Sequence, residues 1–110
     1  MAWIYESERV VGVANTETFG TGITSTEAEP KTLAAVFITV SAREQNRIRL
    51  WLEREKILDV IDGVLPLEGD YFRYEIPVDL EIPIGRTVKP AVLCGGTATD
   101  LNIAFKYEVR

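Results

Sequence analysis

The chain has 110 residues, with 17 acidic and 12 basic side chains and a net charge of −5. This length suits one domain with a modest core. An acidic chain without a basic stripe is repelled by phosphate backbones, so nucleic-acid binding is not expected. The absence of histidine removes Ser-His-Asp and Cys-His catalysis and His-ligated metals. The single cysteine, Cys94, cannot form an intramolecular disulfide and is expected to be buried.

No segment predicts a membrane span. The longest apolar run without a charge, residues 32–42, is too short to cross a bilayer. The first residues have neither a basic region nor a long apolar run, so no secretory signal is expected. We therefore expect a protein that is made in the cytoplasm and does not bind membranes.

The first 31 residues are the least regular part of the sequence. Residues 3–5 and 10–13 are apolar enough for one or two strands, whereas residues 15–30 are rich in Thr, Ser, Gly and Glu and cannot bury much surface. We predict that residues 1–31 form an N-terminal arm and loop, separate from a domain of residues 32–110. The arm is expected to contact a neighbouring subunit, and a strand within the same chain at residues 10–13 is the alternative.

Residues 32–41 form a strand that is apolar on both faces. One predicted face carries Ala34, Val36, Ile38 and Val40, and the other carries Leu33, Ala35, Phe37 and Thr39. An antiparallel strand normally has one wet face, so this strand is predicted to be central and covered on both sides. The cover would be either the N-terminal segment or another subunit.

Residues 42–63 allow two interpretations. The capping-box pattern of residues 41–44 and the possible stop at Gly63 favour a helix over about 42–62, which would give an α+β fold. On a helical wheel, however, the apolar residues spread around the helix and form no single stripe. We therefore favour two strands, residues 47–53 and 56–61, joined by a tight connection.

Polar and apolar residues alternate most regularly in residues 73–82 and 100–110. A period of two places alternate side chains on opposite faces, so strands are predicted at 71–82, near 87–94 and at 100–110. Pro77 and Pro90 cannot donate to a ladder and predict an edge or a bulge. The pattern predicts an all-β, antiparallel, jelly-roll-like sandwich of seven or eight strands. The expected core residues are Val36, Ile38, Ile48, Leu50, Leu52, Ile76, Val78, Leu80, Leu101, Ile103 and Phe105.

Three carboxylates, Glu75, Asp79 and Glu81, share one face of a predicted strand. Neighbours two apart lie roughly 7 Å from each other, which is within the range of a glycosidase pair or of calcium ligands. The simpler interpretation is a solvated acidic face that protects a sheet edge. We predict no catalytic residue, no cofactor and no metal site, and hence a protein that is not an enzyme.

Aromatic residues outside the predicted core are the remaining candidates for function. Trp3 and Tyr5 lie in the arm, and Trp51 lies on the polar face of its predicted strand. Such residues stack on sugar rings, anchor protein interfaces, or form a small satellite core. The residues predicted to form an interface are Trp3, Ile4, Tyr5, Phe19, Phe37 and Trp51.

The layout of the chain resembles the small jelly-roll sandwiches of viral and phage structural proteins, such as decoration or cement proteins and tail or spike modules. The resemblance lies in the Thr- and Gly-rich residues 15–30, the doubly apolar residues 33–40, the run 74–85 and the closing strand 100–110. It implies a non-enzymatic virion component that forms a homo-oligomer, with a trimer expected by analogy, and binds a capsid or other structural protein. The alternative is a carbohydrate-binding β-sandwich module.

Overall fold

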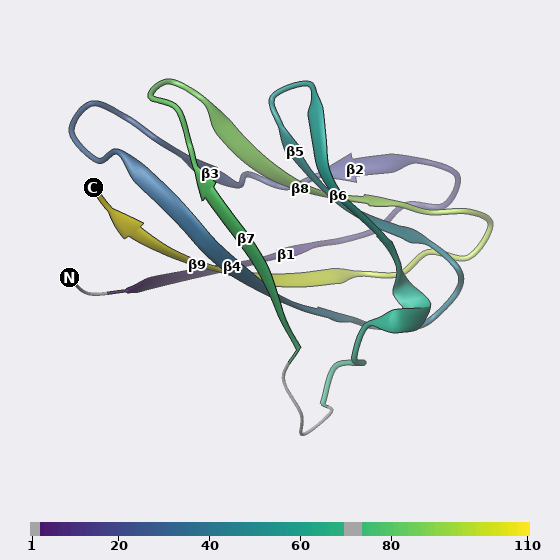
Figure 1. Cartoon of the computed structure of the whole chain (residues 1–110). Helices are drawn as coiled ribbons and strands as arrows, with labels where there is room; N and C mark the ends of the chain where they lie inside the picture. Colours follow the sequence, from purple (N-terminus) through teal and green to yellow (C-terminus); the bar gives the residue numbers. More distant parts are fainter. Residues whose placement is uncertain (1–2, 70–73) are drawn as a thin grey trace.

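The computed structural model describes residues 3–69 and 74–110, and in these residues two antiparallel sheets pack face to face (Figure 1). The first sheet has the order β1-β9-β4-β7, with β1 at Ile4–Val10, β9 at Leu101–Val109, β4 at Lys31–Val40 and β7 at Glu75–Glu81. The second sheet has the order β2-β8-β5-β6, with β2 at Glu17–Phe19, β8 at Thr87–Leu93, β5 at Arg47–Leu52 and β6 at Glu55–Ile61. The short strand β3, Ile23–Thr24, also pairs with β8.

The strands pair as a long hairpin that has been rolled into two layers. The strand β1 pairs with β9, β2 and β3 pair with β8, β4 pairs with β7, and β5 pairs with β6. If β2 and β3 are counted as one interrupted strand, these pairs are those of an eight-stranded jelly roll. The predicted all-β, antiparallel, jelly-roll-like sandwich is confirmed.

Pro90 explains the interruption between β2 and β3. It lies in β8 opposite the segment 20–22, and because proline has no N–H, it cannot donate to a neighbouring strand. Its carbonyl still accepts a hydrogen bond from the amide of Gly20 at 2.8 Å. The edge or bulge that Pro90 predicted for its own strand is wrong, since β8 lies between β2 and β5 and pairs with β5 without a register shift. Pro90 instead coincides with a break in the strand beside it.

The two strands predicted within residues 47–61 are confirmed as β5 and β6, and the alternative helix at 42–62 is wrong. In β5, Ile48 and Leu50 are fully buried, whereas Arg47 at the start of the strand is exposed. This is expected for a strand with one buried face. The tight connection contains Glu53 with a φ of 53°. The structure describes one helical element, a 3₁₀ turn at Asp62–Val64, and no helix in residues 3–69 and 74–110 is long and apolar enough to cross a membrane.

Residues 4–31 belong to the sandwich, so the boundary predicted after residue 31 does not separate two structural units. The whole of β1 pairs with β9, from Ile4 opposite Tyr107 to Val10 opposite Leu101. A strand within the same chain was the alternative prediction, but it lies at residues 4–10 and not at 10–13. Pairing with β9 satisfies the backbone groups on one side of this segment, which fixes it in the sheet of its own chain.

A bulge in β4 changes the faces predicted for this strand. The register shifts between Leu33 and Ala35, so Leu33 faces the core together with Val36 and Ile38. The sequence had predicted Leu33 on the face opposite Val36. The strand β4 is central, as predicted, because it lies between β9 and β7.

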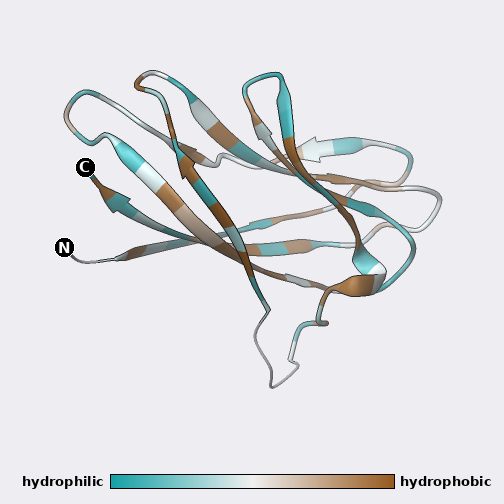
Figure 2. Cartoon of the chain, viewed as in Figure 1, coloured by the Kyte–Doolittle hydropathy of each residue, from teal (hydrophilic) through white to brown (hydrophobic). Residues whose placement is uncertain are grey.

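The core lies between the two sheets, and β7 covers it incompletely. Polar and apolar residues alternate along β7 as predicted (Figure 2), but Ile76, Val78 and Leu80 are only half-buried. Leu52 at the end of β5 is also half-buried. These four side chains are less buried than predicted, because β7 is the last strand of its sheet and Leu52 is the last residue of β5. The predicted core residues that are buried are Val36, Ile38, Ile48, Leu50, Leu101, Ile103 and Phe105.

The three other predicted strands match closely. The strand expected at 71–82 is observed as β7 from Glu75 to Glu81, and residues 71–73 lie outside the described residues. The strands expected near 87–94 and at 100–110 are observed as β8 and β9. Cys94 is buried, as predicted.

Candidate functional site

A shallow groove of about 660 Å³ crosses the outer face of the four-stranded sheet. The alternation of β9 buries Leu101, Ile103 and Phe105 and turns the residues between them outward. Small residues form the floor, since Ala104 lies directly beside Ser7 on one side and Phe37 on the other. The groove is lined by Tyr5, Ser7, Arg9, Phe37, Thr39, Tyr74, Asn102 and Ala104.

Aromatic side chains gather along this groove. The rings of Tyr5 and Phe37 lie 6.3 Å apart at an interplanar angle of 45°. Close to them, the Lys106 ammonium lies 5.1 Å from the centre of the Trp3 ring and 3.6 Å from a carboxylate oxygen of Glu75. Trp3, Tyr5 and Tyr74 are 47%, 59% and 47% exposed, respectively. The strands β1 and β4 and the residues that directly precede β1 and β7 therefore contribute to an aromatic surface that remains open to solvent.

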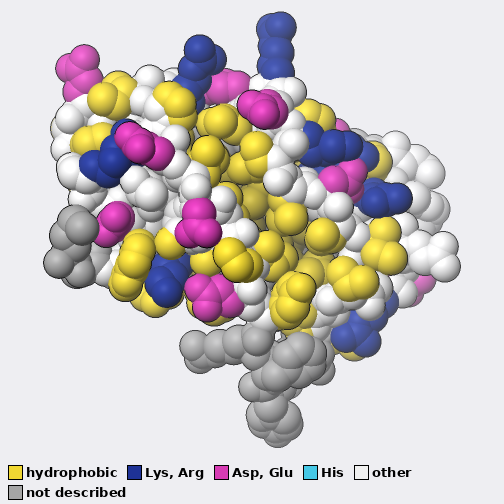
Figure 3. Space-filling model, viewed as in Figure 1, with side chains coloured by type: hydrophobic (Ala, Val, Ile, Leu, Met, Phe, Trp, Pro, Cys, Tyr) yellow, Lys and Arg dark blue, Asp and Glu magenta, His cyan; other side chains and the backbone are white. Residues whose placement is uncertain are grey.

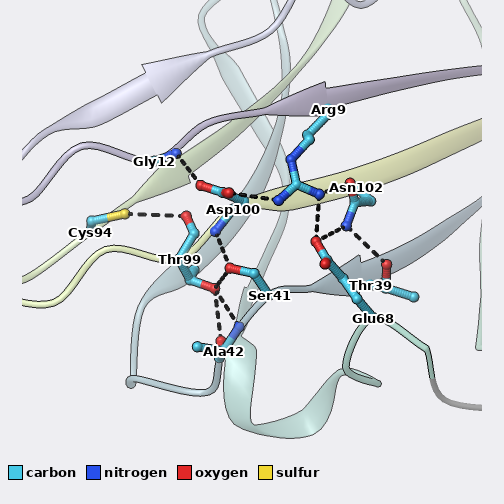
Figure 4. A network of polar contacts seen from close by, with 10 residues as sticks. All are labelled: Arg9, Gly12, Thr39, Ser41, Ala42, Glu68, Cys94, Thr99, Asp100 and Asn102. Carbon is cyan, nitrogen blue, oxygen red and sulfur yellow. Dashed lines mark hydrogen bonds and ion pairs between the residues drawn. The ribbon is translucent and has the colours of Figure 1, made fainter.

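The end of the groove near β1 carries a network of polar side chains (Figure 4). Arg9 donates to Asp100 Oδ2 at 2.7 Å, to Asn102 Oδ1 at 2.9 Å and to Glu68 Oε1. The Asn102 amide in turn donates to Glu68 Oε1 at 2.7 Å and to Thr39 Oγ1 at 3.3 Å. This network joins β1, β4 and β9 to the loop that carries Glu68.

The electrostatics of the network favour its charged form. Hydrogen bonds from Asn102 and Arg9 hold the pKa of the Glu68 carboxyl below its ordinary value of 4.5. Hydrogen bonds to Glu68 and Asp100 raise the pKa of Arg9. The contact between Arg9 and Glu68 therefore favours the charged forms of both side chains.

Asp100 extends the network to the backbone of the neighbouring loops. Its second oxygen accepts a hydrogen bond from the Gly12 amide at 3.1 Å, and its own amide donates to Ser41 Oγ at 2.8 Å. Beside it, Thr99 Oγ1 donates to the Ala42 carbonyl at 2.8 Å. Because these contacts hold three loops together, Asp100 and Thr99 have a structural role at the end of the groove.

A second polar cluster lies on the outer face of the other sheet. Glu17 Oε2 accepts hydrogen bonds from Arg49 at 3.1 Å and from the Trp51 indole at 3.2 Å. Arg49 also lies 3.5 Å from Asp59. A hydrogen bond from Lys56 and the charge of Arg49 lower the pKa of Asp59. Trp51 was predicted to be an exposed interface residue, but it is half-buried and held by Glu17.

The structure divides the six predicted interface residues between different faces. Tyr5 and Phe37 line the groove, and Trp3 lies outside its lining against Lys106. Phe19 and Trp51 lie on the outer face of the other sheet. Ile4 points away from Trp3 and Tyr5, since it lies opposite the buried Tyr107.

Of the residues that line the groove, the sequence analysis named only Tyr5 and Phe37 as interface residues, and Arg9, Tyr74 and Asn102 are among those it missed. The period-two pattern of residues 3–9 could have placed Arg9 on the same face as Trp3 and Tyr5. Nothing in the sequence could have brought Asn102 next to Arg9, because 93 positions separate them.

The acidic residues Glu75, Asp79 and Glu81 do not form a carboxylate cluster of their own. Glu75 pairs with Lys106, and Glu81 lies 3.5 Å from Arg110. Asp79 has a φ of 50°, a left-handed conformation, and it lies where the pairing of β7 with β4 shifts its register. Among residues 3–69 and 74–110, no group of three or more Cys, Asp or Glu side chains is arranged to hold a metal ion.

No family model, curated protein or solved structure matches this chain.

Proposed function

We propose that this chain is a non-enzymatic structural protein that assembles with copies of itself and with another protein of a virion or phage particle, as capsid decoration or cement proteins do. The observation that carries the proposal is the aromatic surface of the groove, where Trp3, Tyr5 and Tyr74 are each about half exposed. Clustered exposed aromatic residues mark interaction sites, because burying them against a partner gains a large contact area.

The polar residues beside the groove favour a protein partner over a sugar. Arg9 and Asn102 direct their hydrogen bonds to Glu68, Asp100 and Thr39, so their main polar groups are already used within the chain. A sugar depends on free donors and acceptors for its hydroxyls, whereas a protein surface can bind mainly by apolar contact. The groove residue Phe37 would form the centre of such a contact.

Carbohydrate binding is the second candidate, and one observation favours it. The tilted pair of Tyr5 and Phe37 opens onto a groove whose volume of about 660 Å³ suits a small ligand. Tyrosine and phenylalanine rings could stack against sugar rings at this place. The site would then act on its own in a monomeric chain.

Two measurements on the intact chain separate these functions. Sedimentation velocity over a range of protein concentrations is expected to give a mass that rises above that of the monomer, and a glycan array is expected to give no signal. A chain that stays monomeric and gives a glycan signal lost in Tyr5→Ala would replace the assembly proposal with carbohydrate binding. A monomer without any glycan signal would contradict the self-assembly part of the proposal.

A further inference from the structure

The edge strand β1 leaves one row of backbone groups unpaired in the part of the chain that the structure describes. It lies at the end of its sheet and pairs on one side only, with β9. All seven residues from Ile4 to Val10 pair with β9 in one continuous register. The free side of β1 is therefore long and regular, and its N–H and C=O groups can pair with a further strand.

The hydrogen bonds between β9 and β4 show which backbone groups lie on the free side of β1. The carbonyl of Asp100, just before β9, accepts a hydrogen bond from the Ser41 amide at 3.1 Å. The amide of Arg110, just after β9, donates to the Pro30 carbonyl at 2.7 Å. Both residues therefore direct their backbone groups toward the β4 side. Because successive residues of an antiparallel strand direct these groups to opposite sides, the odd-numbered residues of β9 bond to β1.

Tyr5, Ser7 and Arg9 consequently direct their backbone groups away from the sheet. Each of them lies opposite an even-numbered residue of β9, whereas Glu8, for example, lies opposite Ile103 and bonds to it. All three residues are exposed. The free edge of β1 thus offers an N–H and a C=O group at every second residue, as a pairing strand requires.

The other sheet edges carry features that hinder the addition of a strand. Pro77 in β7 has no N–H, and Asp79 has a left-handed backbone. The pairing of β6 with β5 shifts its register between Leu50 and Trp51, and β2 and β3 are three and two residues long. Native proteins protect sheet edges by such devices. Among the edges within residues 3–69 and 74–110, β1 therefore combines length with a regular register in a way that the others do not.

The free side of β1 is acidic, in contrast to the side between β6 and β7, where hydrophobic side chains gather between the two sheets (Figure 3). Glu6 and Glu8 lie on the face of β1 that is turned toward the second sheet, where they border a hollow of about 280 Å³ with Phe105. Glu8 accepts hydrogen bonds from the amides of Thr21 at 2.9 Å and Gly22 at 2.7 Å. Neither Glu6 nor Glu8 forms an ion pair with a lysine or arginine of the described residues.

The cations near β1 do not compensate these two charges. Arg9 already binds the carboxylates of Glu68 and Asp100. The other nearby cations are also paired with acids, Lys106 at 3.6 Å from Glu75 and Lys31 at 3.9 Å from Glu29. The charges of Glu6 and Glu8 therefore remain in excess along the free edge.

These charges favour a different protein over a second copy of this chain. A two-fold axis that paired all seven residues of β1 with β1 of a second copy would place Glu6 opposite Glu8 of the partner subunit. Like charges directly opposite each other destabilise a pair of strands. A strand with basic residues at these positions would instead be attracted.

We propose that an extended segment of a different protein, with basic residues alternating with apolar ones, adds to β1 as an antiparallel fifth strand of the sheet. This inference rests on the partner protein in the proposed function. The basic side chains of the segment lie opposite Glu6 and Glu8. Its apolar side chains lie opposite Tyr5, Ser7 and Arg9, where they extend the wall of the groove.

The geometry of the pair specifies which backbone groups of the added segment bind. Residues opposite Tyr5, Ser7 and Arg9 exchange hydrogen bonds with them, so the apolar residues donate to β1 and the basic residues donate away from it. The probe is an acetylated and amidated octapeptide in which lysine alternates with valine. Methylation of its valine nitrogens is expected to raise the dissociation constant by about tenfold or more, because the donors to β1 are lost. Methylation of the lysine backbone nitrogens is the matched control and should leave the dissociation constant within about twofold.

The charge preference has its own test. Glu6→Lys is expected to weaken the binding of the lysine–valine peptide by about threefold. Glu27→Lys makes the same charge change on an exposed loop residue and should leave the dissociation constant unchanged. A peptide in which glutamate replaces each lysine is expected not to bind. Equal binding of the two peptides, or equal effects of the two variants, would overturn the preference for a basic segment.

Amide hydrogen exchange of the intact chain locates the contact. With the lysine–valine peptide bound, the amides of Tyr5, Ser7 and Arg9 are expected to exchange more slowly. No binding of the peptide, protection at other residues, or equal weakening by both methylations would overturn the strand addition. Sedimentation velocity of the chain alone tests the self-assembly in the proposed function. A chain that self-associates without binding the peptide would overturn only the strand addition, and a monomeric chain that binds the peptide would contradict only self-assembly.

Discussion

Arg9 on β1 and Asp100 before β9 lie 91 positions apart in the chain, yet Arg9 Nη2 donates to Asp100 Oδ2 at 2.7 Å. The same guanidinium binds Glu68. One exposed arginine on the first strand therefore contacts both the start of the last strand and the loop that carries Glu68. Because the network borders the groove, its ionisation is expected to influence both stability and the shape of the groove.

The ionisation of Glu68 gives a prediction for pH. Asn102 and Arg9 lower its pKa in the folded state below the ordinary value of 4.5. A carboxyl whose pKa is lower in the folded state contributes stability above its unfolded pKa and loses it as the pH falls through the folded pKa. Glu68→Gln should therefore be less stable than wild type at pH 7, and the difference should shrink as the pH falls below about 4.5.

Urea unfolding at pH 7 and at pH 3 measures this difference. The control is Glu27→Gln, which removes a carboxylate from an exposed loop residue. If the difference between Glu68→Gln and wild type is the same at both pH values, the charged network does not contribute in the way described.

Glu17 is the shared acceptor of Arg49 and Trp51, and its removal should destabilise the fold. Its partner Arg49 is mostly buried, so Glu17→Ala leaves two donors without their acceptor. We expect a loss of about 1–2 kcal/mol in the free energy of unfolding. Glu17→Gln keeps an acceptor oxygen and should lose less. Equal losses for both variants would show that the hydrogen bonds to Glu17 are not the cause.

The edge position of β7 predicts that two valine-to-alanine substitutions lower the free energy of unfolding by unequal amounts. Val36 is fully buried, whereas Val78 on the edge strand is half-buried. Val36→Ala should cost about 2–3 kcal/mol, and Val78→Ala about 1 kcal/mol, because the second deletion removes less buried surface and leaves no closed cavity. Chemical unfolding at low protein concentration, where any dimer has dissociated, measures both values. If Val78→Ala lowers the free energy of unfolding as much as Val36→Ala does, Val78 is as well buried within the chain as Val36.

Gly22 has a backbone conformation and a close contact that a residue with a side chain cannot accommodate without strain. Its φ is +74°, and a Cβ atom there would lie 1.9 Å from the carbonyl oxygen of Val88. Gly22→Ala should therefore lower stability by more than about 2 kcal/mol, measured as a fall in the urea midpoint. Gly96→Ala is the control, since a Cβ at Gly96 has no neighbour within 4 Å. A variant Gly22→Ala with wild-type stability would contradict the close approach of this turn to β8.

From residue 32 onward, the sequence by itself determined which segments are strands and which residues of a regular strand face the same way, whereas β1 lies at residues other than those predicted and β2 and β3 lie in a segment predicted to be a loop. In β9 the alternation from Leu101 to Val109 is unbroken, and the predicted inward residues are buried. Local patterns are sufficient here because the direction of a side chain in a strand depends only on its own backbone. The strands β5 and β6 were identified for the same reason.

The tertiary structure alone decided which strands are neighbours and which faces are covered. The bulge in β4 returned Leu33 to the core, and nothing in the residues 33–36 marks its position. Val78 has the same alternation as Ile103 but is only half-buried, because β7 is an edge strand and β9 is central. The contact of Arg9 with Asp100 likewise depends on the pairing of the first strand with the last. Pairing over such distances is set by the packing of the whole chain, which no local pattern contains.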